Sequence, residues 1–123
     1  MTNILSLLAV IAVVESGGDT NAIGRCGEVG IYQIAISVLT DYNHATGAGC
    51  KLEHLHNPDV SYDVASWQLQ RLAVSLDRHA IPVTAESLCK AWRLGLHGYL
   101  RGDDGEAYWR KCKKEINKQK ESK

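Results

Sequence analysis

The 123-residue sequence predicts a single, mainly α-helical domain with little or no β-structure. Three observations lead to this prediction: apolar residues recur at helical spacing, residues typical of helix caps precede these segments, and glycines follow them. A chain of this length is long enough to bury a hydrophobic core. We expect five helices, joined by glycine-rich loops, in one domain over residues 1–123.

The first helix is expected over Ile4–Ser16, with Thr2 or Asn3 as its N-cap. Gly17 or Gly18 ends it, because glycine adopts the left-handed cap conformation without steric cost. The segment is almost wholly apolar, but it is too short for a membrane span, which needs about 20 residues. Since no Lys or Arg precedes it, it also differs from an export signal, and we interpret it as a core helix.

Residues 17–33 are rich in glycine and predict irregular backbone. A short extended piece and then a second helix, over about residues 35–45, should follow, with Gly47 as its end. We expect a loop from His44 to Asn57.

Asn57 and Pro58 predict the start of a long helix that runs to about His79, since Asn caps and Pro fits the first turn. Thr84 is expected to cap a fourth helix that Gly95 stops.

Residues 96–105 are expected to form a linking loop. Asp103 and Glu106 have the spacing of a capping box, which predicts a last helix that continues into a Lys-rich end.

The formal net charge is zero, but it is unevenly distributed. Residues 110–123 carry seven Lys or Arg against two Glu, a net charge of +5, and the remaining residues balance it with −5. A nucleic-acid-binding domain would show a larger basic face, so we expect no nucleic-acid partner. The basic end is either a solvated helix end or a weak tether to an anionic wall or membrane.

The four cysteines, Cys26, Cys50, Cys89 and Cys112, have no CxxC spacing, so a zinc site is not expected. We predict disulfides Cys26–Cys50 and Cys89–Cys112; free buried thiols are the alternative. The pair of histidines at 54 and 56 is expected to lie on the surface. We therefore expect no metal and no cofactor.

Glu15 is the most informative single residue, because it follows an apolar run at the C-terminal end of a predicted helix. Burial against hydrocarbon and the negative helix end both disfavour the charged form of a carboxyl group. A carboxyl group that stays protonated near neutral pH is suited to act as a general acid. Aromatic residues and a glycine-rich loop with Tyr32 and Gln33 are typical of sugar-binding sites.

Four short segments occur in an order that resembles the soluble lytic transglycosylase domain. They are Glu15-Ser16-Gly17-Gly18, Gly30-Ile31-Tyr32-Gln33-Ile34, Asn57-Pro58 before a long helix, and Ala91-Trp92-Arg93-Leu94-Gly95. The resemblance covers about residues 5–100 and implies a lysozyme-like fold of the goose-type or soluble-transglycosylase kind, with a groove between two lobes.

The resemblance implies that Glu15 is the catalytic residue of a peptidoglycan lytic transglycosylase. In that family a single glutamate protonates the bond between N-acetylmuramic acid and N-acetylglucosamine, then acts as a base and yields 1,6-anhydro-muropeptides. By match, Ser16 positions Glu15 or the substrate, Gln33 hydrogen-bonds the substrate, and Gly30 lets the backbone approach it. Tyr32 either lines the groove or packs beneath it.

Trp92 and Arg93 stand where the family has tyrosine and asparagine. Indole N–H can donate a hydrogen bond, which makes Trp92 a candidate substrate-binding residue. The substitution also motivates one alternative, a catalytically impaired glycan-binding module. The other alternative is a hydrolytic lysozyme, which needs a second group to activate water. Asp19, Glu28 and Asp41 are the acids near the motifs, and none of them stands in a convincing position in the sequence.

The resemblance implies peptidoglycan glycan strands as the partner and action on the cell wall, in the periplasm or outside the cell. We expect a monomer without a stable membrane span. A single domain of this kind suits a bacteriophage lysis or virion enzyme, or a subunit of a secretion assembly.

Overall fold

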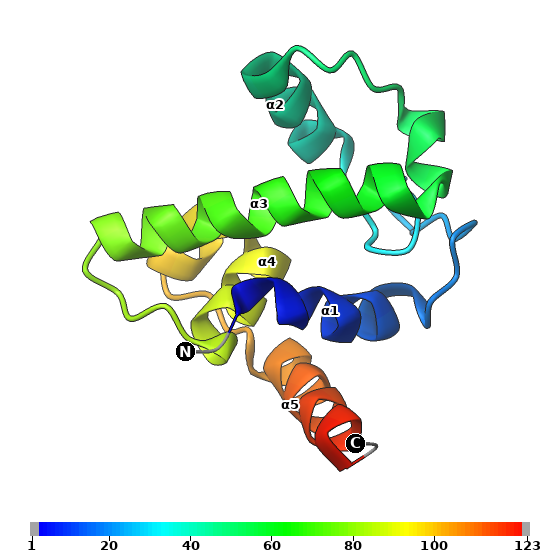
Figure 1. The fold of residues 1–123 in the computed structure, drawn as a ribbon. Coiled ribbons are helices and arrows are strands. Elements are labelled where there is room, and N and C mark those ends of the chain that lie inside the picture. The colour runs from blue at the N-terminus through cyan, green and yellow to red at the C-terminus, as the bar shows by residue number, and fades with distance from the viewer. Residues whose placement is uncertain (1–2, 122–123) are drawn as a thin grey trace. The chain divides into compact units, whose positions relative to one another are not determined.

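The computed structural model describes residues 3–121, and its architecture is mainly helical as predicted (Figure 1). The α-helices are α1 (Leu7–Ser16), α2 (Ile36–Thr46), α3 (Pro58–Arg78), α4 (Ala85–Leu100) and α5 (Glu106–Glu121). Two short 3₁₀ helices, η1 (Ile4–Ser6) and η2 (Leu52–His56), precede α1 and α3. Extended structure among the described residues is limited to isolated bridges, Ile23 to Val29 and Val29 to Ile34.

The chain divides into two compact units. We call Ile11–Gln68 the central unit, and Met1–Val10 together with Leu69–Lys123 the terminal unit. Both divisions fall inside helices, the first within α1 and the second within α3.

The predicted first helix is confirmed, with a 3₁₀ first turn. The Asn3 carboxamide oxygen accepts a hydrogen bond from the Leu5 amide at 3.0 Å, so Asn3 is the cap, while Thr2 lies outside the described residues. Leu8 and Ile11 have almost no exposed area, which confirms that this apolar segment belongs to the core. Within residues 3–121, no helix combines the length and apolar character that crossing a membrane requires.

In the central unit, α2 ends as predicted at Gly47, whose φ of 72° is left-handed. The expected loop from His44 to Asn57 is partly wrong, because η2 forms within it. Leu55 of η2 has no exposed area, and this apolar anchor explains why the segment folds back instead of extending into solvent. Tyr42 of α2 and Trp67 of α3 pack edge to face with ring centroids 5.7 Å apart.

The start of α3 confirms the Asn-Pro prediction. The Asn57 side-chain oxygen accepts from the Asp59 amide at 2.9 Å, and Pro58 is the first helical residue. Val64, Leu69 and Leu76 are fully buried along one face of α3. Helical spacing of apolar residues therefore placed this helix correctly.

In the terminal unit, Thr84 caps α4 as predicted: its hydroxyl accepts from the Ser87 amide at 3.0 Å, and the Ser87 hydroxyl accepts from the Thr84 amide at 2.9 Å. Gly95, with φ 75° and ψ 161°, interrupts the helix where the sequence predicts a stop. The chain then forms a further helical turn to Leu100, so the predicted 96–105 loop is too long.

The last helix begins at Glu106, but the predicted capping box is wrong. The Asp104 carboxylate, not that of Asp103, accepts from the Glu106 amide, at 2.8 Å. Asp103 is instead paired with the Arg101 guanidinium at 2.5 Å. The box fails because Gly105, whose carbonyl accepts from the Trp109 amide, occupies the N-cap position, and Asp103 lies two residues before it.

The predicted disulfides are not formed, because all four cysteines are present as thiols. Cys26 is exposed and Cys50 half-buried, whereas Cys89 on α4 and Cys112 on α5 are fully buried. The loop residues are therefore unlinked, and the two helical residues occupy core positions.

Candidate active site

Glu15 is the penultimate residue of α1 and belongs to the central unit. Its side chain is half-buried. The helix that carries it is almost wholly apolar, with Ile11 and Ala12 buried in the preceding turn. The carboxyl group is thus held where a rigid apolar helix ends, near the negative end of the helix dipole.

Ser16 ties this helix end to a loop distant in sequence. Its hydroxyl donates to the Ile31 carbonyl at 2.7 Å and also lies 3.1 Å from the Ala12 carbonyl. The same oxygen accepts from the Gly18 amide at 3.2 Å, where the chain leaves α1. Ser16 therefore links the Glu15 helix end to the loop that contains the second motif, as part of the central unit.

The second motif forms a tight turn at the end of a narrow hairpin. The Gln33 amide donates to the Gly30 carbonyl at 3.1 Å, which closes the four-residue turn. Val29 and Ile34 exchange two backbone hydrogen bonds of 3.1 Å on either side of it. These bonds fix the position of Gly30 and Gln33 in the central unit.

Gln33 has a positive φ of 54°, a conformation that costs a non-glycine residue about 1 kcal/mol or more. Its side-chain amide compensates by donating to the Gly30 carbonyl at 3.0 Å and the Ala22 carbonyl at 3.3 Å. The side chain thus fastens the turn to the preceding loop. Strained residues of this kind often mark functional sites.

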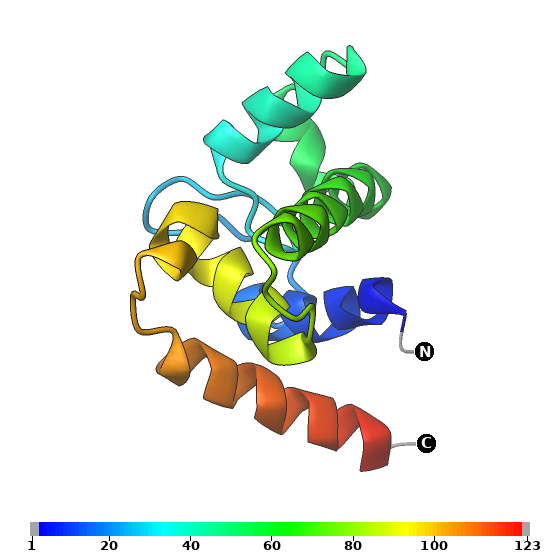
Figure 2. The ribbon, with the colours of Figure 1, turned by 90° about the vertical axis from the view of Figure 1, so that its left-hand side faces the viewer.

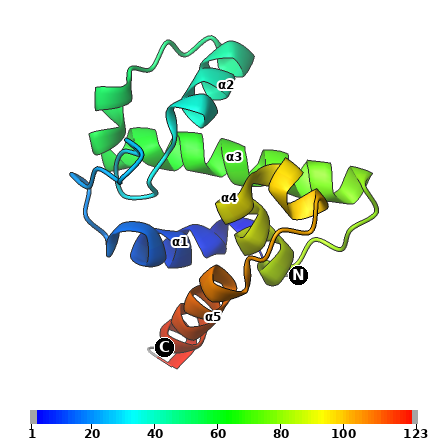
Figure 3. The same cartoon turned by 180° about the vertical axis from the view of Figure 1, so that it is seen from behind.

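Gly30 is buried, and a β-carbon there would meet the Leu55 carbonyl oxygen and lie 3.0 Å from the Ser61 hydroxyl. Ser61 in turn donates to the Leu55 carbonyl at 2.5 Å. The structure therefore requires glycine because the turn packs directly on η2 and the start of α3, as the rear view in Figure 3 illustrates. The sequence prediction gave only close approach to substrate as the reason.

Tyr32 lies within the same turn and is 8% exposed. Burial, with a smaller contribution from Tyr62, raises the pKa of its hydroxyl above the usual value. The sequence left two roles open for Tyr32, lining the groove or packing beneath it. The burial of its side chain favours packing.

Trp92 lies on α4 in the terminal unit and is half-buried. The Arg93 guanidinium lies over the Tyr108 ring of α5, 5.9 Å from its centroid, a cation–π arrangement. Arg93 therefore has a packing role between two helices of this unit. The four remaining sequence-predicted site residues, Ser16, Gly30, Tyr32 and Gln33, share the central unit with Glu15.

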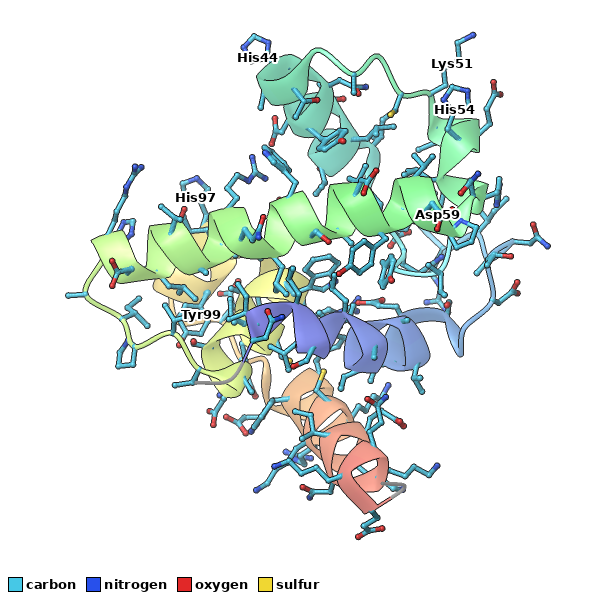
Figure 4. The ribbon with its side chains drawn as sticks, in the orientation of Figure 1. His44, Lys51, His54, Asp59, His97 and Tyr99 are labelled. Atoms are coloured by element: carbon cyan, nitrogen blue, oxygen red, sulfur yellow. The ribbon has the colours of Figure 1, made fainter. Side chains whose placement is uncertain are left out.

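The histidines near the second 3₁₀ helix have backbone partners. The His54 ring accepts from the Lys51 amide at 3.0 Å, and Figure 4 labels both residues at η2. His56 Nδ1 is 3.1 Å from the Thr20 carbonyl. In the described part of the chain, no group of three or more His, Cys, Asp or Glu side chains is arranged to hold a metal ion.

Sequence reasoning missed the residues that support the turn: Ala22, Leu55 and Ser61. Leu55 was assigned to a loop, and Ser61 looks like an ordinary polar residue of a long helix. The available signal was weak: Ser61 stands on the same helical face as Val64 and Ala65, which are apolar.

Comparison with known proteins agrees with the order of these motifs. A family model described as the transglycosylase SLT domain matches residues 2–121. Searches of curated proteins and of solved structures gave no match. Since the family model covers nearly the whole chain, this chain belongs to the transglycosylase SLT domain family.

Proposed function

We propose that the protein is a peptidoglycan lytic transglycosylase that uses Glu15 as its catalytic acid and base. Membership of a family of lytic enzymes that act on the cell wall supports this proposal. The observation that carries it is local: Glu15 ends an apolar helix, and the adjacent Ser16 hydroxyl fastens that end to the Gly30–Gln33 turn. One carboxyl group and one substrate-facing turn are thereby held in a fixed relation.

In the first step, Glu15 donates its proton to the glycosidic oxygen between N-acetylmuramic acid and N-acetylglucosamine. The bond from the muramic C1 to that oxygen breaks, and N-acetylglucosamine leaves with a new hydroxyl group. Positive charge develops at C1, next to the carboxylate that has just formed. In this proposal the carboxyl group carries its proton before the reaction, as a general acid must.

In the second step, the Glu15 carboxylate accepts the proton of the muramic C6 hydroxyl. The C6 oxygen then bonds to C1 and closes a 1,6-anhydro ring, which regenerates protonated Glu15 without water. A single carboxyl group is sufficient because the nucleophile belongs to the substrate. A hydrolytic lysozyme would need a second group to activate water.

The remaining residues of the proposed site orient Glu15 and hold the substrate. Ser16 orients the helix end that carries Glu15, and the Gly30–Gln33 turn contacts the sugar next to the scissile bond. Because both Gln33 side-chain hydrogens are directed at backbone carbonyls, its side-chain oxygen is the atom that would accept from the substrate. Tyr32 supports the turn from beneath, and Trp92 contributes a further substrate contact.

Peptidoglycan strands are the substrate, and no cofactor enters the scheme. The protein would act as a monomer in the periplasm or outside the cell, within a phage lysis or virion apparatus or a secretion assembly. The basic end of the chain, which the structure describes as α5 up to Glu121, is its candidate tether to an anionic surface.

The decisive experiment is digestion of purified sacculi with wild-type protein and with Glu15→Gln, followed by mass analysis of the released fragments. We expect anhydro-muropeptides, each lighter by one water than the hydrolytic product, from the wild type. Glu15→Gln keeps the shape of the side chain but cannot donate a proton, so lysis should fall by at least about a hundredfold.

Glu53→Gln is the matched control, because Glu53 is an exposed carboxylate of the same unit. It should digest sacculi at the wild-type rate. Reducing-end products would show hydrolysis instead, and unchanged lysis by Glu15→Gln would remove Glu15 from the mechanism. Binding of glycan fragments without any lysis by the wild type would identify a binding module.

A further inference from the structure

Two side-chain oxygens converge in the segment between α1 and α2, which is the light-blue loop in Figure 2. They are Oε1 of Gln33 and Oε1 of Glu28, and both lie next to Gly24. A β-carbon on Gly24 would meet the Gln33 oxygen and lie 2.7 Å from the Glu28 oxygen. Because residue 24 has no side chain, the two oxygens share this space, and we call Glu28 and Gln33 the acceptor pair.

The backbone of the central unit explains why the two side chains meet. Val29 forms an antiparallel bridge with Ile23 and another with Ile34. The first bridge places Gly24 opposite Glu28, and the Gly24 amide donates to the Glu28 carbonyl at 2.7 Å. The second bridge brings the tight turn of the second motif to the same residue. The acceptor pair is therefore held by backbone hydrogen bonds within one unit.

Both side chains of the pair keep an oxygen for a donor from outside the chain. The Gln33 side-chain amide donates to the Gly30 and Ala22 carbonyls, so its oxygen is directed away from them. Glu28 Oε1 accepts from the Cys26 amide at 2.8 Å. Within residues 3–121, no hydrogen bond is donated to Gln33 Oε1 or Glu28 Oε2, and no Lys, Arg or His forms an ion pair with Glu28. Since both side chains are only half-buried, a ligand can reach them.

We propose that the acceptor pair binds an amino group of the glycan strand, so that the enzyme favours strands in which some glucosamine residues lack their acetyl group. This inference rests on the proposed function, in which the Gly30–Gln33 turn contacts the sugar next to the scissile bond. An ammonium group carries three N–H donors and a positive charge, and it has no acceptor. It can therefore donate to the Glu28 carboxylate and to the Gln33 amide oxygen at the same time.

The acetylated sugar fits the same pair less well. An acetamido group offers one N–H donor, and its carbonyl oxygen is a further acceptor that finds no donor at the pair. A sugar hydroxyl group also donates only one hydrogen bond. Both groups are neutral and leave the Glu28 carboxylate without a counter-charge. The pair thus discriminates between substrates by charge and by the number of donors.

The test compares glycan strands that differ only in their acetyl groups. Strands that contain some glucosamine are freed of stem peptides with an amidase, so that the glycan carries the only primary amines. One half is re-acetylated with acetic anhydride in bicarbonate, and the release of anhydro-ended fragments is measured for both halves. Because solvent screens a half-exposed pair, we expect wild-type protein to cut the glucosamine-containing half only about three- to tenfold faster. High salt should reduce this ratio.

Glu28→Gln removes the charge but keeps the shape of the side chain and an oxygen for the Cys26 amide. Its ratio of the two rates should be close to one. Glu53→Gln is the matched control, because Glu53 is an exposed carboxylate of the same unit, and it should keep the wild-type ratio. Equal cutting of both halves by the wild type, or an unchanged ratio in Glu28→Gln, would overturn the inference. Anhydro-ended products in that experiment would still support the proposed function.

Binding distinguishes the two proposals if neither half is cut. In calorimetry, wild-type protein and Glu53→Gln should bind a tetramer of glucosamine more tightly than a tetramer of N-acetylglucosamine, and Glu28→Gln should lose this difference. Such a binding preference without cleavage would count against the proposed reaction alone. Equal affinity of the wild type for both tetramers would overturn the acceptor pair.

Discussion

Gly30 shows how a single position without a side chain controls the second motif. A β-carbon would meet the Leu55 carbonyl oxygen, and φ of +88° is unfavourable for any other residue. We predict that Gly30→Ala lowers the free energy of unfolding by about 2–4 kcal/mol, measured by urea denaturation. Gly27→Ala is the control: Gly27 has nearly the same φ of +86°, but no atom lies within 4 Å of its added β-carbon.

Gly27→Ala should cost only about 1 kcal/mol, the contribution of backbone conformation alone. The difference between the two variants then measures the clash with η2. Equal losses for both glycines would mean that the turn moves away from Leu55 without cost, and that its packing does not fix the motif.

The Ser16 hydroxyl is the second residue-scale feature, because it joins Glu15's helix end to the turn at 2.7 Å. We predict that Ser16→Ala lowers the rate of sacculus digestion about tenfold or more, while the free energy of unfolding falls by only about 1 kcal/mol. Ser16→Thr, which keeps the hydroxyl, should recover most of the rate. Ser6→Ala is the control, because the Ser6 hydroxyl also donates to a backbone carbonyl, that of Asn3, at 2.7 Å.

Ser6 lies at the opposite end of the first helical segment, exposed to solvent. Its variant should therefore keep the wild-type rate. A rate loss for Ser16→Ala that merely follows its loss of stability would indicate a structural role only.

At the scale of elements, Lys90 of α4 links two helices of the terminal unit. Its ammonium group lies 2.6 Å from carboxylate oxygens of Glu86 and of Glu106, the first residue of α5. The hydrogen bonds to Glu106 and then to Glu86 raise the pKa of Lys90 above its usual value. Because both carboxylates are about half exposed, we expect Lys90→Met to cost only about 0.5–1 kcal/mol at neutral pH.

The pH dependence follows from the raised pKa. A raised pKa in the folded state stabilises the protein below the ordinary lysine value of about 10.4, and the contribution is lost as pH rises above it. The difference in urea midpoint between wild type and Lys90→Met should stay constant from pH 7 to 9 and shrink beyond about pH 10.5. Lys114→Met, an exposed lysine of α5, should show no such trend.

Elements were predicted well where local chemistry fixes them. Residues that begin or end a helix do so through the backbone conformation and the hydrogen bonds that their residue type favours. These residues are Asn57 with Pro58, Thr84, Gly47 and Gly95. Prediction was wrong where two acidic residues precede one helix. Asp103 has the spacing of a capping box, but α5 begins two residues later than that spacing requires, and Asp104 accepts from the Glu106 amide instead.

At the scale of the whole molecule, ordered motifs in the sequence predict the residues of the candidate site, but not the residues that support them. Leu55 and Ser61 contact Gly30 across a separation of 25 residues or more, which no local pattern reveals. Cys89 and Cys112 were placed correctly on two successive helices that contact each other, but the disulfide predicted between them is not formed. Their bonding state depends on oxidants outside the chain, which the sequence does not specify.

Helices α1 and α3 each contribute residues to both units, so the units should unfold as one. Trp67 reports on the central unit, while Trp92 and Trp109 report on the terminal unit. We predict that Leu55→Ala, a fully buried change in the central unit, costs about 2–5 kcal/mol and lowers both fluorescence midpoints in urea equally. The measurement uses Trp67→Phe in one background and the paired Trp92→Phe and Trp109→Phe in the other.

Leu88→Ala provides the reciprocal control, because Leu88 is 1% exposed in the terminal unit. It should likewise move both signals together, since loss of either core removes support from the same two helices. A shift confined to the unit that carries the substitution would instead mean that α1 and α3 melt at the unit boundary. In that case a loss of stability in the terminal unit would leave the Glu15 helix end and the Gly30–Gln33 turn intact, and at urea concentrations that unfold α4 the digestion of sacculi by Leu88→Ala would fall only by the loss of the Trp92 contact.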